Sequence, residues 1–209
     1  MPGAKAMEKS LNSTMEEFGG RVASVWQGMR PATKKLVERA LQTTSPPRAT
    51  PYDARAEWEL SHLLAALEDR AAETREEMNA EQTAALRHMA ETCAAVLHAQ
   101  ARSAESFEQL LVRALRASDY ARVDLLADSL ASRLAPPEIS ELARSNNVVV
   151  RAIAYETLAL APTSVLIQLL TDPVDAEVAR FALYIQAEEY GSEEARWVLE
   201  TLEGAEEED

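Results

Sequence analysis

Residues 54–115 read ARAEWELSHLLAALEDRAAETREEMNAEQTAALRHMAETCAAVLHAQARSAESFEQLLVRAL, and this stretch decides the fold class. It contains neither glycine nor proline, the two residues that most disfavour the interior of a helix. Leu60, Leu63, Leu64 and Leu67 recur at the three- and four-residue spacing of a helix that buries one side. We therefore predict an all-α protein in which residues 54–117 form a long helix or a helical hairpin.

Two arrangements of this stretch remain open. A single rod of ~60 residues would be ~90 Å long, at a rise of 1.5 Å per residue. However, residues 68–82 are mostly polar, and Asn79 followed by Gln82 matches the capping box that starts a helix, so the chain can also fold back there. The second half of the stretch is rich in alanine and threonine, which bury little area in a coiled coil. We expect residues 54–117 to pack against another helix, of this chain or of a second copy in a homo-oligomer.

Residues 1–42 form a basic amphipathic arm ahead of this stretch, and residues 43–53 (TTSPPRATPYD) form a proline-rich linker. The arm combines an apolar stripe with nearby positive charge, a composition suited to a partner's groove or an anionic membrane surface. Its candidate partner-binding residues are Val22, Trp26, Met29, Lys34, Lys35 and Leu36. Three destinations remain open: the arm packs on its own body, docks on a partner, or tethers the protein to a membrane surface through residues 21–42.

The charge is unevenly distributed along the chain. Residues 1–50 carry eight Lys and Arg against four Glu, whereas residues 51–209 carry thirteen Arg against thirty-one Asp and Glu. An acidic body repels a phosphate backbone, which disfavours nucleic acid as a partner. It also suggests an alternative function, a regulatory protein that sequesters a basic partner. Residues 203–209 are predicted to be an acidic disordered tail.

An internal repeat with an offset of 29 residues occupies the last part of the chain. It places Arg151 over Arg180 and Tyr155 over Tyr184. Each unit is interpreted as two helices, because Ser, Thr, Asn, Asp or Pro stands where each helix would start. The predicted starts are Ser118, Asn147 and Asp175 for the first helices and Pro137, Thr163 and Ser192 for the second. A helical hairpin of this size buries its apolar side only by stacking on its neighbours.

Two segments of this repeat, NNVVVRAIAY (146–155) and DPVDAEVARFAL (172–183), resemble the HEAT-type α-solenoid pattern. The resemblance implies HEAT-like repeats over residues 118–202, a stacked scaffold that binds partners along its surface. It implies no chemistry. Arg151 and Arg180 are candidate partner-binding residues, and we also expect them to reach carboxylates of neighbouring units.

The sequence contains no motif that predicts catalysis, a metal site or a cofactor. His88, Cys93 and His98 are five residues apart, and each such step turns a helix by about 140°, so the three side chains do not converge on one ion. With a single cysteine and no apolar leader, we expect a cytoplasmic protein, and the alanine- and arginine-rich usage is typical of a GC-rich bacterial genome. The predicted function is a non-enzymatic adaptor or structural component that binds protein partners through the helical stack and the long helices.

Overall fold

The computed structural model describes residues 11–43, 51–73 and 78–206. The regular secondary structure of these residues is entirely helical, which confirms the predicted all-α fold. The chain divides into two compact units, Met1–Ala101 (unit 1) and Arg102–Asp209 (unit 2). Each unit is described by itself below.

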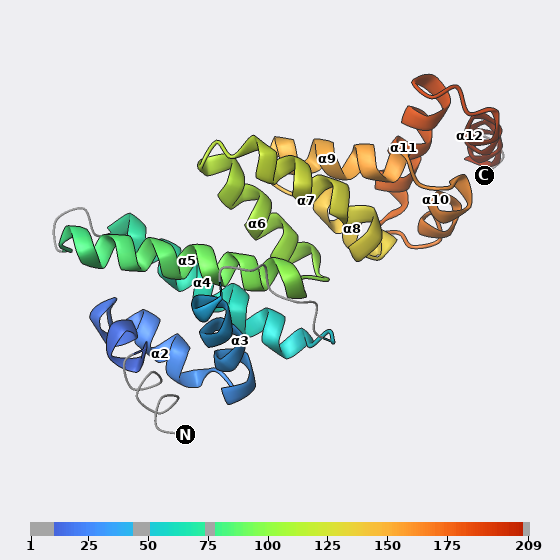
Figure 1. The fold of residues 1–209 in the computed structure, drawn as a ribbon. Coiled ribbons are helices and arrows are strands. Elements are labelled where there is room, and N and C mark those ends of the chain that lie inside the picture. Colours follow the sequence, from blue (N-terminus) through green and yellow to red (C-terminus); the bar gives the residue numbers. More distant parts are fainter. Residues whose placement is uncertain (1–10, 44–50, 74–77, 207–209) are drawn as a thin grey trace. The chain divides into compact units, whose positions relative to one another are not determined.

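Unit 1 is built on a helical hairpin. Its arms are α4 (Ala54–Glu73) and α5 (Ala80–Gln100), which lie side by side (Figure 1). Asn79 starts α5 through the predicted capping box: the Gln82 backbone NH donates to Asn79 Oδ1 at 2.8 Å, and the Asn79 NH donates to Gln82 Oε1 at 3.2 Å. Residues 54–100 therefore fold as a hairpin, and the single rod over residues 54–117 is wrong.

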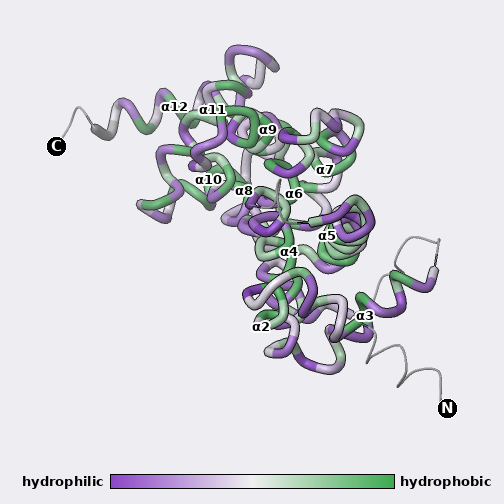
Figure 2. Tube along the Cα trace, turned by 90° about the vertical axis from the view of Figure 1, so that its left-hand side faces the viewer, coloured by the Kyte–Doolittle hydropathy of each residue, from purple (hydrophilic) through white to green (hydrophobic). Residues whose placement is uncertain are grey.

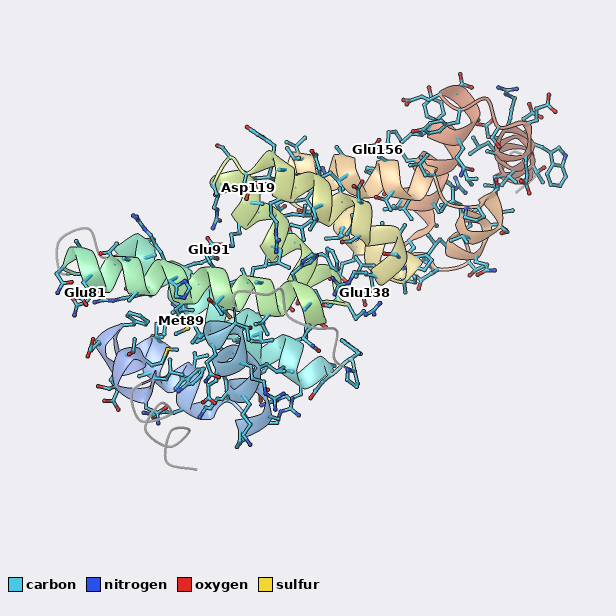
Figure 3. The ribbon with its side chains drawn as sticks, in the orientation of Figure 1. Glu81, Met89, Glu91, Asp119, Glu138 and Glu156 are labelled. Carbon is cyan, nitrogen blue, oxygen red and sulfur yellow. The ribbon has the colours of Figure 1, made fainter. Side chains whose placement is uncertain are left out.

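The basic arm packs onto this hairpin. Helix α2 (Gly20–Gly28) contacts α4, and α3 (Pro31–Gln42) contacts both α5 and α4, so that α2 and α3 cover one side of the hairpin (Figure 1). Met89 points from α5 toward this layer and is buried, whereas Glu91 points away from it (Figure 3). The described part of the arm therefore packs on its own body, the first of the three destinations left open by the sequence. Residues 1–10 and most of the linker, residues 44–50, lie outside the described residues.

A helix break that the sequence analysis missed separates the two units. Helix α5 ends at Gln100, and α6 (Ala104–Arg116) begins after Ser103, whose Oγ accepts a hydrogen bond from the Ser106 NH at 3.3 Å. The predicted region 54–117 therefore contains three helices and crosses the boundary between the units. Neither glycine nor proline marks this break, and a single serine cap is a weak signal in a helix-rich sequence.

Unit 2 is a succession of packed helices. After α6 come α7 (Tyr120–Arg133), α8 (Pro136–Leu142), α9 (Val148–Ala159), α10 (Thr163–Leu169), α11 (Ala176–Glu188) and α12 (Glu193–Glu206). Helices α7, α9 and α11 pack in one row, and α8 packs on α10 in a second row. Along each helix the trace alternates between hydrophobic and hydrophilic residues, as expected when one side is buried (Figure 2). This packing is compatible with a helical repeat-like fold.

The predicted helix starts in unit 2 agree with the structure at most positions. Asn147 caps α9, because its Oδ1 accepts from the backbone NH groups of Val149 and Val150, and Ser192 Oγ accepts from the Ala195 NH. Ser118 is an exception: its φ of 55° is left-handed, and Asp119 caps α7 in its place. The acidic tail needs a second correction, because α12 continues through residues 203–206, and residues 207–209 lie outside the described part of the chain.

Candidate protein-binding groove

The apolar residues predicted to bind partners through the arm lie inside unit 1. Val22, Trp26 and Met29 are all buried, and the Trp26 Nε1 donates a hydrogen bond to Asn12 Oδ1 at 2.7 Å. Lys34 lies over the Trp26 ring, with its Nζ 5.6 Å from the ring centroid. The apolar side of the arm is therefore not on the surface of the unit.

The two remaining arm candidates do not form a patch with them. Lys35 is exposed, whereas Leu36 beside it is half-buried. Since their apolar neighbours face the hairpin, neither residue extends an exposed apolar stripe.

A buried carboxylate that the sequence analysis missed joins the arm to the hairpin. Glu59 of α4 is only 2% exposed and accepts hydrogen bonds from the Thr33 hydroxyl and, at 3.1 Å, from Arg55 Nε. Arg30 Nε lies 3.3 Å from Glu59 Oε1, and Arg30 Nη2 pairs with the Asp53 carboxylate at 2.9 Å. Asp53, assigned to the linker from the sequence, in fact begins α4 by accepting from the backbone NH groups of Arg55 and Ala56.

The charges in this cluster favour its ionised forms. Burial by itself raises the pKa of Glu59, but the hydrogen bonds from Thr33 and Arg55 and the positive charge of Arg30 outweigh burial and lower that pKa. The hydrogen bond from Arg30 likewise lowers the pKa of Asp53, and the same contact raises the pKa of Arg30. Because every carboxylate in the cluster is paired, the cluster holds α3 against α4.

Cys93 and His62 show ordinary packing contacts. The Cys93 thiol is buried and donates to the Leu60 carbonyl at 3.4 Å. The ring of His62 lies 4.0 Å from that of Trp58, centroid to centroid, with its Nδ1 3.0 Å from the Trp58 carbonyl. In the described ranges, no three His, Cys, Asp or Glu side chains gather in a geometry that would hold a metal ion.

Unit 2 contains a groove with a volume of about 1020 Å³. Helices α7 and α9 supply most of its lining residues, and residues at the starts of α8 and α10 supply others. Its buried base is apolar and consists of Val123, Leu134, Ile139 and Leu158. We refer to the cavity lined by these residues and by those of the next two paragraphs as the α7–α9 groove.

The α7 wall is small and acidic. Asp124, Ala127, Asp128 and Ala131 line the groove, and their spacing of three and four residues places all of them on one side of α7. The two alanines leave room for another chain to approach, and both aspartates are exposed. This pattern was present in the sequence, but it was not recognised because small and acidic residues are also typical of a solvated helix surface.

The opposite wall is mainly apolar. Val149, Ile153, Glu156, Thr157 and Leu160 come from α9 and its C-terminal cap, again at spacings that place them on one side. Leu160 is 67% exposed and Val149 39% exposed, which is unusual for large apolar side chains that line a concavity. Glu156, labelled on α9 in Figure 3, is exposed.

The groove carries negative charge without a compensating positive charge. Among the described residues that line it there is no lysine, arginine or histidine. Asp124, Asp128 and Glu156 form no salt bridge with another residue in the described part of the chain. The arrangement therefore offers an apolar floor beside free carboxylates.

The two arginines predicted as partner-binding residues lie elsewhere in unit 2. Arg151 Nη1 donates to the Ser145 carbonyl at 2.7 Å, so Arg151 holds the turn before its own helix; the predicted contact was with a carboxylate of a neighbouring unit. Arg180 is exposed on α11. Neither residue lines the α7–α9 groove.

A second exposed apolar surface lies on α9 and α11. The rings of Tyr155 and Phe181 meet edge to face at 4.8 Å between centroids, and Phe181 stacks on Tyr184 at 6.2 Å. Phe181 and Tyr184 are both exposed. This aromatic surface is outside the groove.

In the ranges that the structure describes, no single helix is long and apolar enough to cross a membrane; α9 and α10 meet the criterion only as a pair bent by 119°. The chain gives no significant match when compared with protein-family models, with curated proteins or with solved structures.

Proposed function

We propose that this protein is a non-enzymatic adaptor that binds a partner protein in the α7–α9 groove. The observation that carries the proposal is the exposure of Leu160 and Val149 inside a concavity. Large apolar side chains exposed together in a groove are typical of an interaction site, because their burial by a partner is favourable by about 25 cal/mol per Å².

The repeat supports the same function. Unit 2 is compatible with a stack of helical hairpins, and we interpret it as a short HEAT-like scaffold, in line with the sequence resemblance over residues 118–202. Such stacks create extended surfaces between neighbouring helices, and proteins use those surfaces for binding.

In this proposal, unit 1 is a structural module. Membrane tethering through residues 21–42 would require Trp26, which is 1% exposed, to leave the core of unit 1. Burying an aromatic side chain of this size stabilises a fold by roughly 2–3 kcal/mol, so the docked arm favours the adaptor over the tether.

Affinity capture with two matched variants of the full-length protein tests the proposal. Leu160→Arg places a charged side chain in the α9 wall of the groove, and Val174→Arg makes the same change at a residue of similar exposure, 64%, outside the groove. Both positions are exposed, so both variants are expected to fold. We expect wild type and Val174→Arg to retain the same partner from the native lysate and Leu160→Arg to lose it. A partner retained equally by both variants would refute binding in the groove.

A further inference from the structure

The charge and shape of the α7–α9 groove define the chemistry of its occupant. Building on the proposed function, we propose that the groove binds a basic amphipathic helix of a partner protein. The juxtaposition that carries this inference is the acidic, small-residue wall of α7 facing the apolar wall of α9.

The occupant should be helical because the groove offers side chains and no strand edge. An extended peptide obtains affinity from main-chain hydrogen bonds to a sheet edge, and the described residues of this chain contain no strand. A helix satisfies its own backbone groups, so it needs only complementary side chains. Ala127 and Ala131 on α7 allow its backbone to come close.

The occupant should also be positively charged on one side. Asp124 and Asp128 lie one turn apart on α7, and Glu156 projects from α9. Since none of them has a cationic partner among the described residues, lysines or arginines on the incoming helix would supply the missing charges. Its apolar side would cover Leu160 and Val149.

The net charge of unit 2 also favours a positively charged occupant. Residues 102–209 contain nine arginines against 21 aspartates and glutamates, a net charge of −12. By the same count, residues 1–101 contain twelve Lys and Arg against fourteen Asp and Glu, a net charge of −2. The acidic character of the protein is thus concentrated in the unit that contains the groove, where it would accelerate the approach of a cationic partner.

Two synthetic helical peptides test this inference. One carries leucine on one side and lysine on the other, and the second replaces every lysine with glutamate. Binding to the full-length protein is followed by fluorescence anisotropy. We expect saturable binding of the lysine peptide, at least about tenfold weaker binding of the glutamate peptide, and loss of affinity at about 1 M salt, where charges are screened within ~3 Å.

Two triple variants locate the binding. Asp124→Asn/Asp128→Asn/Glu156→Gln neutralises the groove, and Glu177→Gln/Glu188→Gln/Glu200→Gln removes the same charge from exposed positions outside it. The groove variant should weaken the lysine peptide at least about tenfold, a change of about 1.4 kcal/mol, and the control less than about twofold. Equal effects of the two variants would overturn the inference, because binding would then reflect net charge alone.

The remaining outcomes separate this inference from the proposed function. If Leu160→Arg abolishes partner capture while neither peptide binds, the groove still binds a partner and the basic-helix chemistry is wrong. If light scattering shows self-association that the groove variant abolishes, the occupant is a second copy of this chain, and the inference is again overturned.

Discussion

At the scale of single residues, the buried carboxylate of Glu59 joins the arm of unit 1 to its hairpin. It accepts hydrogen bonds from Thr33 on α3 and Arg55 on α4, and it pairs with Arg30 between α2 and α3. Hydrogen bonds to charged groups contribute about 1.5–3 kcal/mol each in favourable cases, although Arg30 and Arg55 retain contact with water and reduce the net gain.

We expect Glu59→Gln to lower the free energy of unfolding by about 1–3 kcal/mol, because a neutral amide pairs poorly with two guanidinium groups. Urea unfolding followed by circular dichroism measures the change. Glu17→Gln removes the same charge from an exposed position of the same unit and should change stability by less than about 0.5 kcal/mol. Equal effects of the two substitutions would show that the cluster contributes only through net charge.

The lowered pKa values of Glu59 and Asp53 predict a pH dependence. As pH falls through their ordinary values, 4.5 and 3.8, the unfolded chain takes up protons while the folded protein stays ionised. The unfolded state then binds more protons, so stability decreases as pH decreases through this window and further toward the folded-state pKa values. Unfolding free energies measured from about pH 6 to about pH 3.5 should fall more steeply for wild type than for Glu59→Gln. The same pH dependence of stability in wild type and Glu59→Gln would contradict the attribution of this pH dependence to Glu59.

At the scale of elements, the helix starts of unit 2 are set by single polar side chains. Asn147 Oδ1 accepts from the Val149 NH at 3.0 Å and the Val150 NH at 3.4 Å, so it satisfies backbone groups that α9 leaves unpaired. Asn147→Ala should destabilise unit 2 by about 0.5–2 kcal/mol. The adjacent Asn146 is exposed, and Asn146→Ala is the matched control. Thermal unfolding of both variants measures the change, and we expect Asn146→Ala to leave stability almost unchanged. A larger loss of stability from Asn146→Ala than from Asn147→Ala would contradict the role of Asn147 as the helix cap.

Gln186 connects elements that flank the groove. From α11 it donates to the carbonyls of Ala159 and Ala161, and its Oε1 accepts from the Thr163 hydroxyl. Gln186→Leu leaves these buried groups unpaired and should cost about 1–3 kcal/mol. Gln168→Leu, at an exposed site on α10, is the control for the gain in apolarity. Chemical denaturation of both variants measures the change in the free energy of unfolding. A Gln186→Leu protein as stable as wild type would show that these hydrogen bonds do not contribute to stability.

The sequence predicted these elements better than it predicted their assembly. Spacing and caps are local signals, which is why the hairpin, its capping box at Asn79 and the start of α9 at Asn147 were found. The hydrogen bond of Trp26 to Asn12 joins residues 14 positions apart, and the pairing of Glu59 with Arg30 joins residues 29 positions apart. One sequence carries no record of such contacts. The groove was missed for the same reason, since its two walls belong to different helices.

At the scale of the whole molecule, the two units have different charge and different exposed surfaces. Unit 1 buries the apolar side of its basic arm, whereas unit 2 keeps Leu160 exposed beside free carboxylates. From these differences we propose that unit 2 binds the partner and that unit 1 has a structural role.

Photo-crosslinking from the groove tests that assignment most directly. A photoreactive phenylalanine analogue replaces Leu160 in one full-length variant and Val174 in another, and both are irradiated in the cells that make the protein. These two positions are similarly exposed and differ in whether they lie in the groove. We predict one discrete protein adduct from position 160 and none from position 174. The same adduct from both positions, or an adduct from position 174 alone, would contradict the account.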